Sequence, residues 1–269
     1  MNKYNRDNIK SDMIKAVIMR ADFSGITDIN LYVDRLKQSD IVNKAFDKMS
    51  TIRGESNSID NFSAETDDIT LPISEKPKSN LYHFHECNVV GPKDTYLDIS
   101  ENYICLQIFC DNDYSGSKGY SKVFAECINL LKDYDSYISI NRIGIRKVDS
   151  VELNEESERN NYFNQNFIVG ECIATRNESN SRNLNLANLT QVIKQNSISI
   201  NIVQQVRPDK DKITAILDID AFITGKTLHD NLGDKLESFI YNDMQDTMFE
   251  QFVNCMSETY LESHLKQQK

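Results

Sequence analysis

Two histidines and a cysteine alternate along a strand-like run in the first half of the chain. They are His83, His85 and Cys87. On a β-strand this spacing places both imidazoles and the thiol on one face, and these are ligand types that zinc prefers. Cys105 or Cys110 could supply a fourth ligand, although the spacing does not specify which. The alternative is a partly exposed strand face with two neutral histidines, which the lack of a second ligand pair favours.

Two aspartates alternate in the run Leu217–Phe222, where Asp218 and Asp220 point to the same side of an expected strand. Paired carboxylates can bind Mg²⁺ or divide the roles of general acid and general base. A solvated strand face opposite the apolar residues Leu217 and Ile219 explains the same alternation. The sequence therefore offers a second candidate site, with solvation as the simpler interpretation.

Two arginines, Arg142 and Arg146, share one face of another expected strand, with Gly144 between them. Guanidinium groups on an apolar face need partners, and a glycine between them would let an anion or a second backbone approach closely. This pattern predicts a contact with an anion or an acidic partner. An internal salt bridge to one of the many carboxylates is the default alternative.

A segment rich in glycine and serine, residues 113–119, precedes an expected helix and could hold a phosphate at the helix N-terminus. Its spacing departs from the phosphate-binding pattern GxxxxGK[ST], and a flexible helix cap explains it as well. The chain contains no GxSxG, HExxH or protein-kinase motif. The sequence therefore favours a protein without catalytic activity.

Apolar residues or tyrosine recur at every fourth position near the C-terminus. The series is Leu228, Leu232, Leu236, Ile240, Met244, Met248, Phe252, Met256 and Tyr260. Four residues turn an ideal α-helix by about 400°, so the stripe winds around a straight helix and one flat core cannot bury it. The capping-box pattern of Thr247 and Glu250 favours a break near residues 241–246. The alternative is a continuous helix that pairs with a second subunit, with an interface at Met244, Met248, Phe252 and Met256.

The elements that would position these residues begin with a strand at Ile14–Phe23 and a helix that is capped by Asp28 and extends, with one interruption, to Met49. Residues 50–80 are polar and predict a loop with at most one short strand near Ile69–Ile73. Further strands are predicted at Leu81–Val90, Tyr96–Ile99, Tyr103–Phe109 and Tyr137–Leu153, with a helix at Tyr120–Leu131. The order β-α-β-β-β-α-β predicts a ferredoxin-like or split βαβ antiparallel sheet.

A polar segment from Asn154 to Asn166 separates two predicted parts of the chain, 1–153 and 154–269. The second part is predicted to be a β-meander followed by helices over residues 227–266. Its strands are expected at Phe167–Thr175, Leu184–Ile193, Ser197–Val206 and Ile213–Ile223. The whole chain is therefore expected to be an α+β protein.

The composition excludes several classes of protein. The 269 residues include 30 Lys and Arg against 41 Asp and Glu, and the resulting net charge of −11 disfavours nucleic-acid binding, which depends on neutralised phosphates. The N-terminus has no apolar segment, and no run of about 18 apolar residues occurs, which argues against export and against a membrane span. Six scattered cysteines without a CxxC pair predict reduced thiols. We expect a cytoplasmic protein.

The run Ile140–Leu153, INRIGIRKVDSVEL, resembles the RIGLRY-N strand of a sporadically distributed bacterial family of uncharacterised proteins. The late strand LDIDAF at Leu217–Phe222 and the closing helical segment from Leu228 to Leu261 are similar to that family as well. The chain departs from it at residues 147–149, Lys-Val-Asp, where an aromatic residue and an asparagine are usual, and it lacks the family's tryptophan. The resemblance implies a two-part α+β protein without an established activity, with some members encoded near toxin or phage-defence genes.

Two functions are expected from these patterns. The first is a non-catalytic interaction module that uses the terminal helical stripe or an exposed strand edge. Its partner would be a second copy of the chain or the product of a neighbouring gene, such as a basic toxin. The second is a metal-assisted enzyme or an anion- or nucleotide-binding domain that uses the histidine cluster or the Asp218 and Asp220 face. No cofactor is expected, apart from zinc if the histidine cluster binds it.

Overall fold

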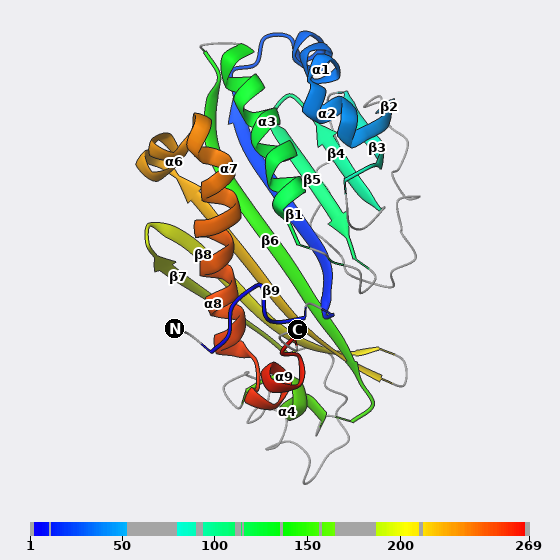
Figure 1. Ribbon diagram of the computed structural model, residues 1–269, viewed down its shortest axis with the longest axis vertical. Helices are drawn as coiled ribbons and strands as arrows, with labels where there is room; N and C mark the ends of the chain where they lie inside the picture. Colours follow the sequence, from blue (N-terminus) through cyan, green and yellow to red (C-terminus); the bar gives the residue numbers. More distant parts are fainter. Residues whose placement is uncertain are drawn as a thin grey trace.

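The computed structural model describes residues 3–10, 12–52, 80–89, 94–110, 114, 116–134, 137–155, 158–164, 187–209 and 212–266. These residues form a mixed α+β structure in which helices pack on one face of a nine-stranded sheet (Figure 1). No helix in the described ranges is long and apolar enough to cross a membrane.

All neighbouring strands of the sheet are antiparallel, and their order is β2-β3-β4-β5-β1-β6-β9-β8-β7. The strands are β1 (Ile14–Ser24), β2 (Phe46–Ile52), β3 (Leu81–Cys87), β4 (Thr95–Ile99), β5 (Tyr103–Phe109), β6 (Ser139–Leu153), β7 (Ala187–Gln195), β8 (Ile198–Asp209) and β9 (Lys212–Thr224). Strand β1 lies between β5 and β6, which are parallel to each other because each is antiparallel to β1. Helix α3 (Lys118–Tyr134) connects β5 to β6.

The predicted meander extends the first sheet. Strand β9 pairs with β6 along the whole run from Arg142 to Leu153, and β8 and β7 continue the sheet beyond β9. The inward residues of β6 and β9, such as Ile145 and Ala221, lie opposite each other and are buried in one core. The strands expected on the two sides of residues 153 and 154 therefore share one sheet.

The helical prediction from Ile41 to Met49 is wrong after Ala45. Helix α1 (Ile29–Gln38) starts where predicted, since the Asp28 side chain accepts a hydrogen bond from the Asn30 amide. Helix α2 (Asp40–Ala45) then ends, and β2 begins at Phe46 because it pairs with β3. The strands predicted near Ile69–Ile73 and at Phe167–Thr175 lie outside the described residues.

One face of the sheet packs against α1, α2, α3 and the C-terminal helices, and the apolar side chains between them form a single core (Figure 1). Tyr32 and Leu36 of α1 and Phe124 of α3 have no exposed surface. The Tyr32 hydroxyl donates to the Cys127 carbonyl at 2.8 Å, which joins the two helices. On the opposite face, a smaller apolar cluster contains Ala16, Val148 and Ile216, with Phe109 packed against it. Short α4 (Arg159–Tyr162) packs against α9 near the chain end.

The C-terminal helical segment is not broken at residues 241–246. It comprises α6 (Gly225–Asn231), a 3₁₀ turn (Gly233–Lys235), α7 (Leu236–Ser238), a π-helix (Phe239–Met244), α8 (Gln245–Cys255) and α9 (Glu258–Ser263). The backbone leaves helical geometry at Leu232 and Met256, where ψ is 157° and 152°. Bonds from residue i to i+5 give a π-helix more residues per turn than 3.6, so an every-fourth pattern stays on one face through this segment.

The apolar stripe is buried in the chain's own core. Ile240 and Met244 have no exposed surface, Met248 is 1% exposed and Met256 is 3% exposed. Of the four residues expected at a subunit interface, only Phe252 is partly exposed. The π-helix and the two non-helical residues, Leu232 and Met256, together explain how one core buries a stripe that a straight α-helix would spread around its axis. The stripe therefore does not offer an interface in this fold.

Candidate functional site

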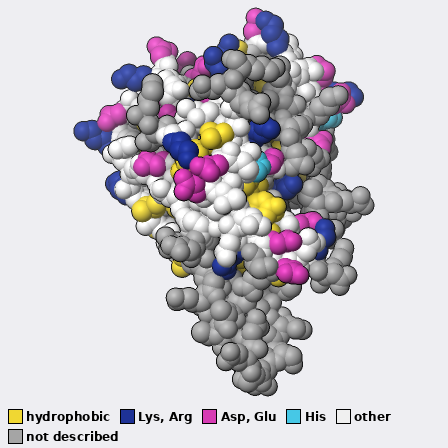
Figure 2. Space-filling view, turned by 60° about the horizontal axis from the view of Figure 1, so that its bottom comes forward, with side chains coloured by type: hydrophobic (Ala, Val, Ile, Leu, Met, Phe, Trp, Pro, Cys, Tyr) yellow, Lys and Arg dark blue, Asp and Glu magenta, His cyan; other side chains and the backbone are white. Residues whose placement is uncertain are grey.

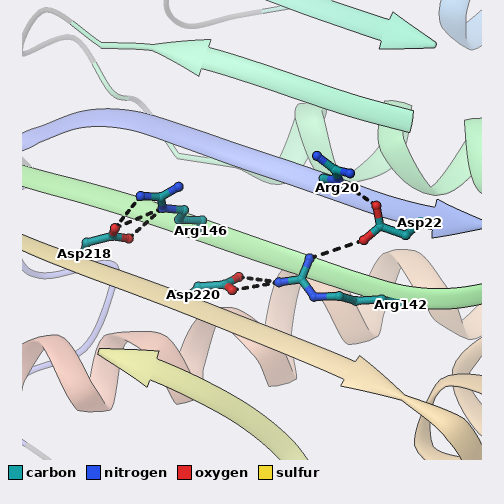
Figure 3. Close-up of polar contacts among 6 residues, drawn as sticks. All are labelled: Arg20, Asp22, Arg142, Arg146, Asp218 and Asp220. Carbon is teal, nitrogen blue, oxygen red and sulfur yellow. Dashed lines mark hydrogen bonds and ion pairs between the residues drawn. The ribbon is translucent and has the colours of Figure 1, made fainter. Parts of the chain in front are cut away.

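The two arginines and two aspartates singled out in the sequence pair with each other across β6 and β9 (Figure 3). The Arg142 guanidinium donates to both carboxylate oxygens of Asp220, at 2.9 and 2.7 Å. Arg146 Nε donates to both oxygens of Asp218, at 2.8 and 3.0 Å. On β1, Asp22 accepts from Arg20 Nε at 2.7 Å and lies 3.7 Å from Arg142. This is the arrangement that the internal salt-bridge alternative expects.

These ion pairs leave little free charge for a ligand. The side chains of Arg142 and Arg146 are 27% and 25% exposed, and each guanidinium has a carboxylate that compensates its charge. Gly144 makes room for the Arg142 guanidinium itself, because a Cβ at this position would lie 2.9 Å from its Nη1 atom. The space that was expected to admit an anion or a second backbone is therefore filled from within the strand.

The histidine cluster forms a stack without the cysteine. The His83 ring lies between His85 and Tyr96, with centroid distances of 5.5 and 5.0 Å, and its Nδ1 atom is 2.7 Å from Asp98 Oδ1. Glu86 has a φ of 59°, which interrupts the strand alternation, and Cys87 packs against the main core. Within the described ranges, no three His, Cys, Asp or Glu side chains are grouped so that they could hold a metal ion.

Among the cysteines that the structure describes, Cys105, Cys110, Cys127 and Cys255 are buried and Cys87 is partly buried, which makes them poor nucleophiles. Burial raises the pKa of Cys105 to about 12, with Asp98 nearby as a smaller cause. Burial likewise raises the pKa of Cys255, although its sulfur lies 3.6 Å from the Gln204 amide nitrogen. A thiol in such surroundings stays protonated at neutral pH and behaves as a small apolar side chain.

A cavity of about 420 Å³ lies on the helical side of the sheet. Its walls come from the N-terminal segment (residues 3–10), β6, the segment before α3, the π-helix, α8 and α9. This volume is in the range of small-molecule sites. The cavity contains two ionisable side chains of β6, Lys147 and Asp149, which occupy positions on the same strand face as Ile143 and Ile145.

Lys147 is held at the cavity wall by the first residue of α8. Its Nζ atom donates to Gln245 Oε1 at 3.1 Å, and the Gln245 side-chain amide in turn donates to the Ser117 hydroxyl, directly before α3. Nζ also lies 5.6 Å from the centroid of the Tyr114 ring. Burial lowers the pKa of Lys147 to about 8, while Asp149 nearby opposes that decrease. The amine is therefore mostly protonated at neutral pH and has N–H groups to spare.

Asp149 is a buried carboxylic acid that lines the same cavity. The residue is 3% exposed. Burial raises its pKa to about 7, with Lys147 as an opposing charge and Asp12 as a further like charge. In the part of the chain that the structure describes, its carboxyl group has neither a hydrogen bond nor an ion pair. A strongly perturbed, unpartnered acid in a cavity is a recognised mark of a functional position.

The two chain ends form one rim of the cavity. The Lys10 amide donates to the His264 carbonyl at 3.0 Å, and the Lys266 amide donates to the Asn8 carbonyl at 2.8 Å. Arg6 Nε donates to Asp246 Oδ1 at 2.6 Å. On the surface at this end of the molecule, basic and acidic side chains are interspersed (Figure 2). Selection of a charged ligand would therefore depend on the groups inside the cavity.

Sequence reasoning missed Lys147 and Asp149 as a site. The available signal was that both positions continue the inward alternation of Ile143 and Ile145, where charged residues are unusual. The segment that was expected to hold a phosphate does reach this cavity, since Gly116 and Ser117 line it. Met248 and Phe252, which were expected at a subunit interface, line it as well, whereas Arg142, Arg146, Asp218, Asp220, His83, His85 and Cys87 do not.

A scan against models of known protein families finds none that matches this chain, and no curated protein matches it either. The family resemblance of Ile140–Leu153 stays a prediction.

Proposed function

We propose that the chain binds a small molecule in the cavity, through an anionic group placed at Lys147. One observation carries this proposal: the amine of Lys147 and the unpartnered carboxyl group of Asp149 line the same cavity of about 420 Å³. Ionisable groups are costly to bury without a compensating partner, and a ligand would supply one. The function proposed is binding, in agreement with the absence of a catalytic motif from the sequence.

Three features make the Lys147 end suitable for an anion. The ammonium group contributes a positive charge. Gln245 orients it through a hydrogen bond of 3.1 Å and is itself held by Ser117. The 17-residue helix α3 begins directly after Ser117, and the positive end of its dipole adds to the field at the cavity wall. These features support anion binding, which the sequence offered as an alternative function. They support it at Lys147 and not at the histidine cluster or the Asp218 and Asp220 face.

Calorimetric titration tests this proposal. The probes are inorganic phosphate, short carboxylates and phosphate monoesters, each paired with a neutral analogue of the same shape. We expect binding of at least one anion, weaker above about pH 8 as Lys147 loses its proton. Lys147→Met should abolish the binding, whereas Lys226→Met, at an exposed position on α6, should leave it unchanged. Equal affinity in the two variants would refute the proposal.

A second candidate function is the interaction module expected from the sequence, now supported by an outer strand. Strand β7 is at one end of the sheet order, and Val192 and Ile193 on it are 72% and 37% exposed. Outer strands with exposed apolar side chains accept an additional strand from a partner. Co-expression with the products of neighbouring genes, followed by size-exclusion chromatography, should give a complex that Val192→Lys weakens. A chain that elutes alone in every combination would argue against this candidate.

We also interpret strands β4, β5, β1 and β6, together with α1 and α3, as a ferredoxin-like unit. The interpretation is supported by the adjacent order β4-β5-β1-β6 and by the helical connection from β5 to β6 across β1. The antiparallel pair of β2 and β3 would then be an insertion at one edge. In this view the cavity lies where the unit meets the C-terminal helices.

A further inference from the structure

Lys147 and Asp149 each have charged neighbours of both signs. For Lys147 these are Asp149, Arg6 and Asp246, and for Asp149 they are Lys147, Asp218 and Asp12. Arg6 is compensated by Asp246, at 2.6 Å. Asp12 is compensated as well, since it accepts a hydrogen bond from the Tyr260 hydroxyl at 2.7 Å and lies 2.8 Å from His264 Nε2. Asp7, Lys10 and Lys266 line the cavity at the chain ends, and the charged groups on its β6 wall are the amine of Lys147 and the carboxyl group of Asp149.

Lys147 and Asp149 form no ion pair with each other in the described structure. They are two residues apart on one face of β6, which separates their Cα atoms by about 6.5 Å along an extended strand. The Lys147 amine donates instead to Gln245. A molecule lying between them could contact both, with a negative group at the first and a positive group at the second.

The surroundings of the Asp149 end suit an organic ammonium group. The rings of Phe249 and Phe252 stack at a centroid distance of 6.0 Å, and Phe252 meets Tyr260 edge to face at 6.3 Å. All three side chains line the cavity. Aromatic faces attract cations and also exclude water from the apolar part of a ligand. A hydrated inorganic cation would use carboxylates alone, whereas an alkylammonium group would use both the Asp149 carboxylate and the rings.

We propose that the ligand of this cavity is a small zwitterion, with its anionic group at Lys147 and its protonated amine at Asp149. The inference rests on the anion site proposed above and adds a second, oppositely charged contact. It names a class of ligand, compounds such as free amino acids that have both charges within a few bonds of each other. The carboxyl proton of Asp149 would be lost on binding, because the ligand's ammonium group stabilises the ionised form.

Titration calorimetry with charge-deleted analogues tests the proposal. The probes are L-phenylalanine with 3-phenylpropanoate and 2-phenylethylamine, and L-leucine with 4-methylpentanoate and 3-methylbutylamine. In each set, the first compound has both charges and the other two have one each. We expect at least one amino acid to bind about tenfold more tightly than either of its analogues. Binding of the amino acid near pH 6 should also release protons, seen as a dependence of the measured heat on the buffer.

Two variants test which side chain contacts which charge of the ligand. Asp149→Asn should remove the preference for the amino acid over its deaminated analogue and leave the affinity for that analogue nearly unchanged. Lys147→Met should remove the preference over the decarboxylated analogue. Asp243→Asn, at an exposed position in the π-helix, changes the net charge as Asp149→Asn does and should have no effect. Far-UV circular dichroism of all variants establishes that they are folded.

The possible failures are distinguishable. If carboxylates bind as tightly as the amino acids, or Asp149→Asn leaves the preference intact, the zwitterion is refuted and the anion site stands. The zwitterion is also refuted, and the anion site retained, if phosphate monoesters bind while neither amino acid does. If no anion binds and Lys147→Met has no effect in any titration, the proposed function fails, and the zwitterion inference fails with it.

Discussion

Replacement of Asp149 by asparagine should stabilise the unliganded protein, and the gain should depend on pH. The residue is 3% exposed, and its carboxyl group has no hydrogen bond within the described structure. Its ionised form is therefore poorly solvated in the folded chain and fully hydrated in the unfolded chain. Asparagine has nearly the same shape and no charge, so the variant resembles the protonated acid at every pH.

The size of the effect follows from the pKa. Folding raises the pKa of Asp149 from 3.8 to about 7, and a shift of this size corresponds to about 4 kcal/mol. Below about pH 4 the carboxyl group is protonated in both the folded and the unfolded chain, so it does not lower the free energy of unfolding. Between about pH 4 and pH 7 the unfolded chain loses the proton first, so the free energy of unfolding falls as the pH rises. Above pH 7 the full cost is present.

The measurement is urea unfolding at several pH values from about 4 to about 8, followed by far-UV circular dichroism. We expect the native chain and the Asp149→Asn variant to have nearly equal free energies of unfolding at about pH 4. At about pH 8 we expect the variant to be more stable. About 4 kcal/mol is the largest gain expected, because the asparagine amide also lacks partners in the cavity. Asp243→Asn serves as the control, since it removes the same charge from an exposed position.

A difference between Asp149→Asn and the native chain that stays constant across this pH range would refute the reasoning. It would mean that the carboxyl group titrates alike in the folded and unfolded states, and therefore that it is solvated or paired. A variant that is less stable at the basic end would be equally damaging, because it would indicate that the ionised carboxylate has a stabilising partner. Either result would also remove the unpartnered acid on which the zwitterion inference depends.

The remaining predictions concern the core, the ion pairs and one turn, and urea unfolding measures each of them. Met248→Ala should lower the free energy of unfolding by about 2–5 kcal/mol, because a side chain that is 1% exposed leaves a void. Asp218→Asn should cost about 1–3 kcal/mol, since it deprives the half-buried Arg146 guanidinium of its carboxylate. Gly25→Ala should destabilise the chain by more than about 1 kcal/mol, because φ is 92° and the new Cβ would lie 2.5 Å from the Tyr137 carbonyl oxygen.

Each of these variants has a matched control. Leu31→Ala removes an apolar side chain that is 55% exposed and should cost much less than the change at Met248. Asp40→Asn breaks an ion pair on the surface, where such pairs contribute at most about 1 kcal/mol. Gly225→Ala has a positive φ of 56° but no atom within 4 Å of the new Cβ, so it isolates backbone strain from the clash. Equal effects within any pair would contradict the structural reason given for it.

Much of the secondary structure was predictable because its causes are local. Strand β5 has the predicted bounds, Tyr103–Phe109, since a short run of apolar and β-branched residues favours a strand in any context. Helix α1 begins at its predicted cap, Asp28, which bonds to an amide two residues away. The prediction failed at Phe46, where the pairing partner of β2 lies in β3, far along the chain. Helical periodicity alone does not reveal such a partner.

For the candidate sites too, local patterns were predictable from the sequence and contacts between distant segments were not. Alternation in the sequence correctly places Arg142 with Arg146 and Asp218 with Asp220 on strand faces. The strand order then decides that these faces are neighbours and neutralise each other. The every-fourth stripe is visible in the sequence, but its burial depends on a π-helix that keeps Ile240 and Met244 on one side. The pattern is unusual, as the sequence indicates, but the predicted break is wrong.

The sequence by itself determined the α+β class, the acidic charge, most strands and the helix starts, because these depend on residue type and on neighbours within a few positions. Only the tertiary structure decided where a ligand could bind. The cavity brings together β6, the start of α3 and the start of α8, and the contact between Gln245 and Ser117 spans 128 positions. The unusual chemistry of Lys147 and Asp149 arises from desolvation, which depends on what surrounds a side chain in space and therefore appears only when the chain is folded.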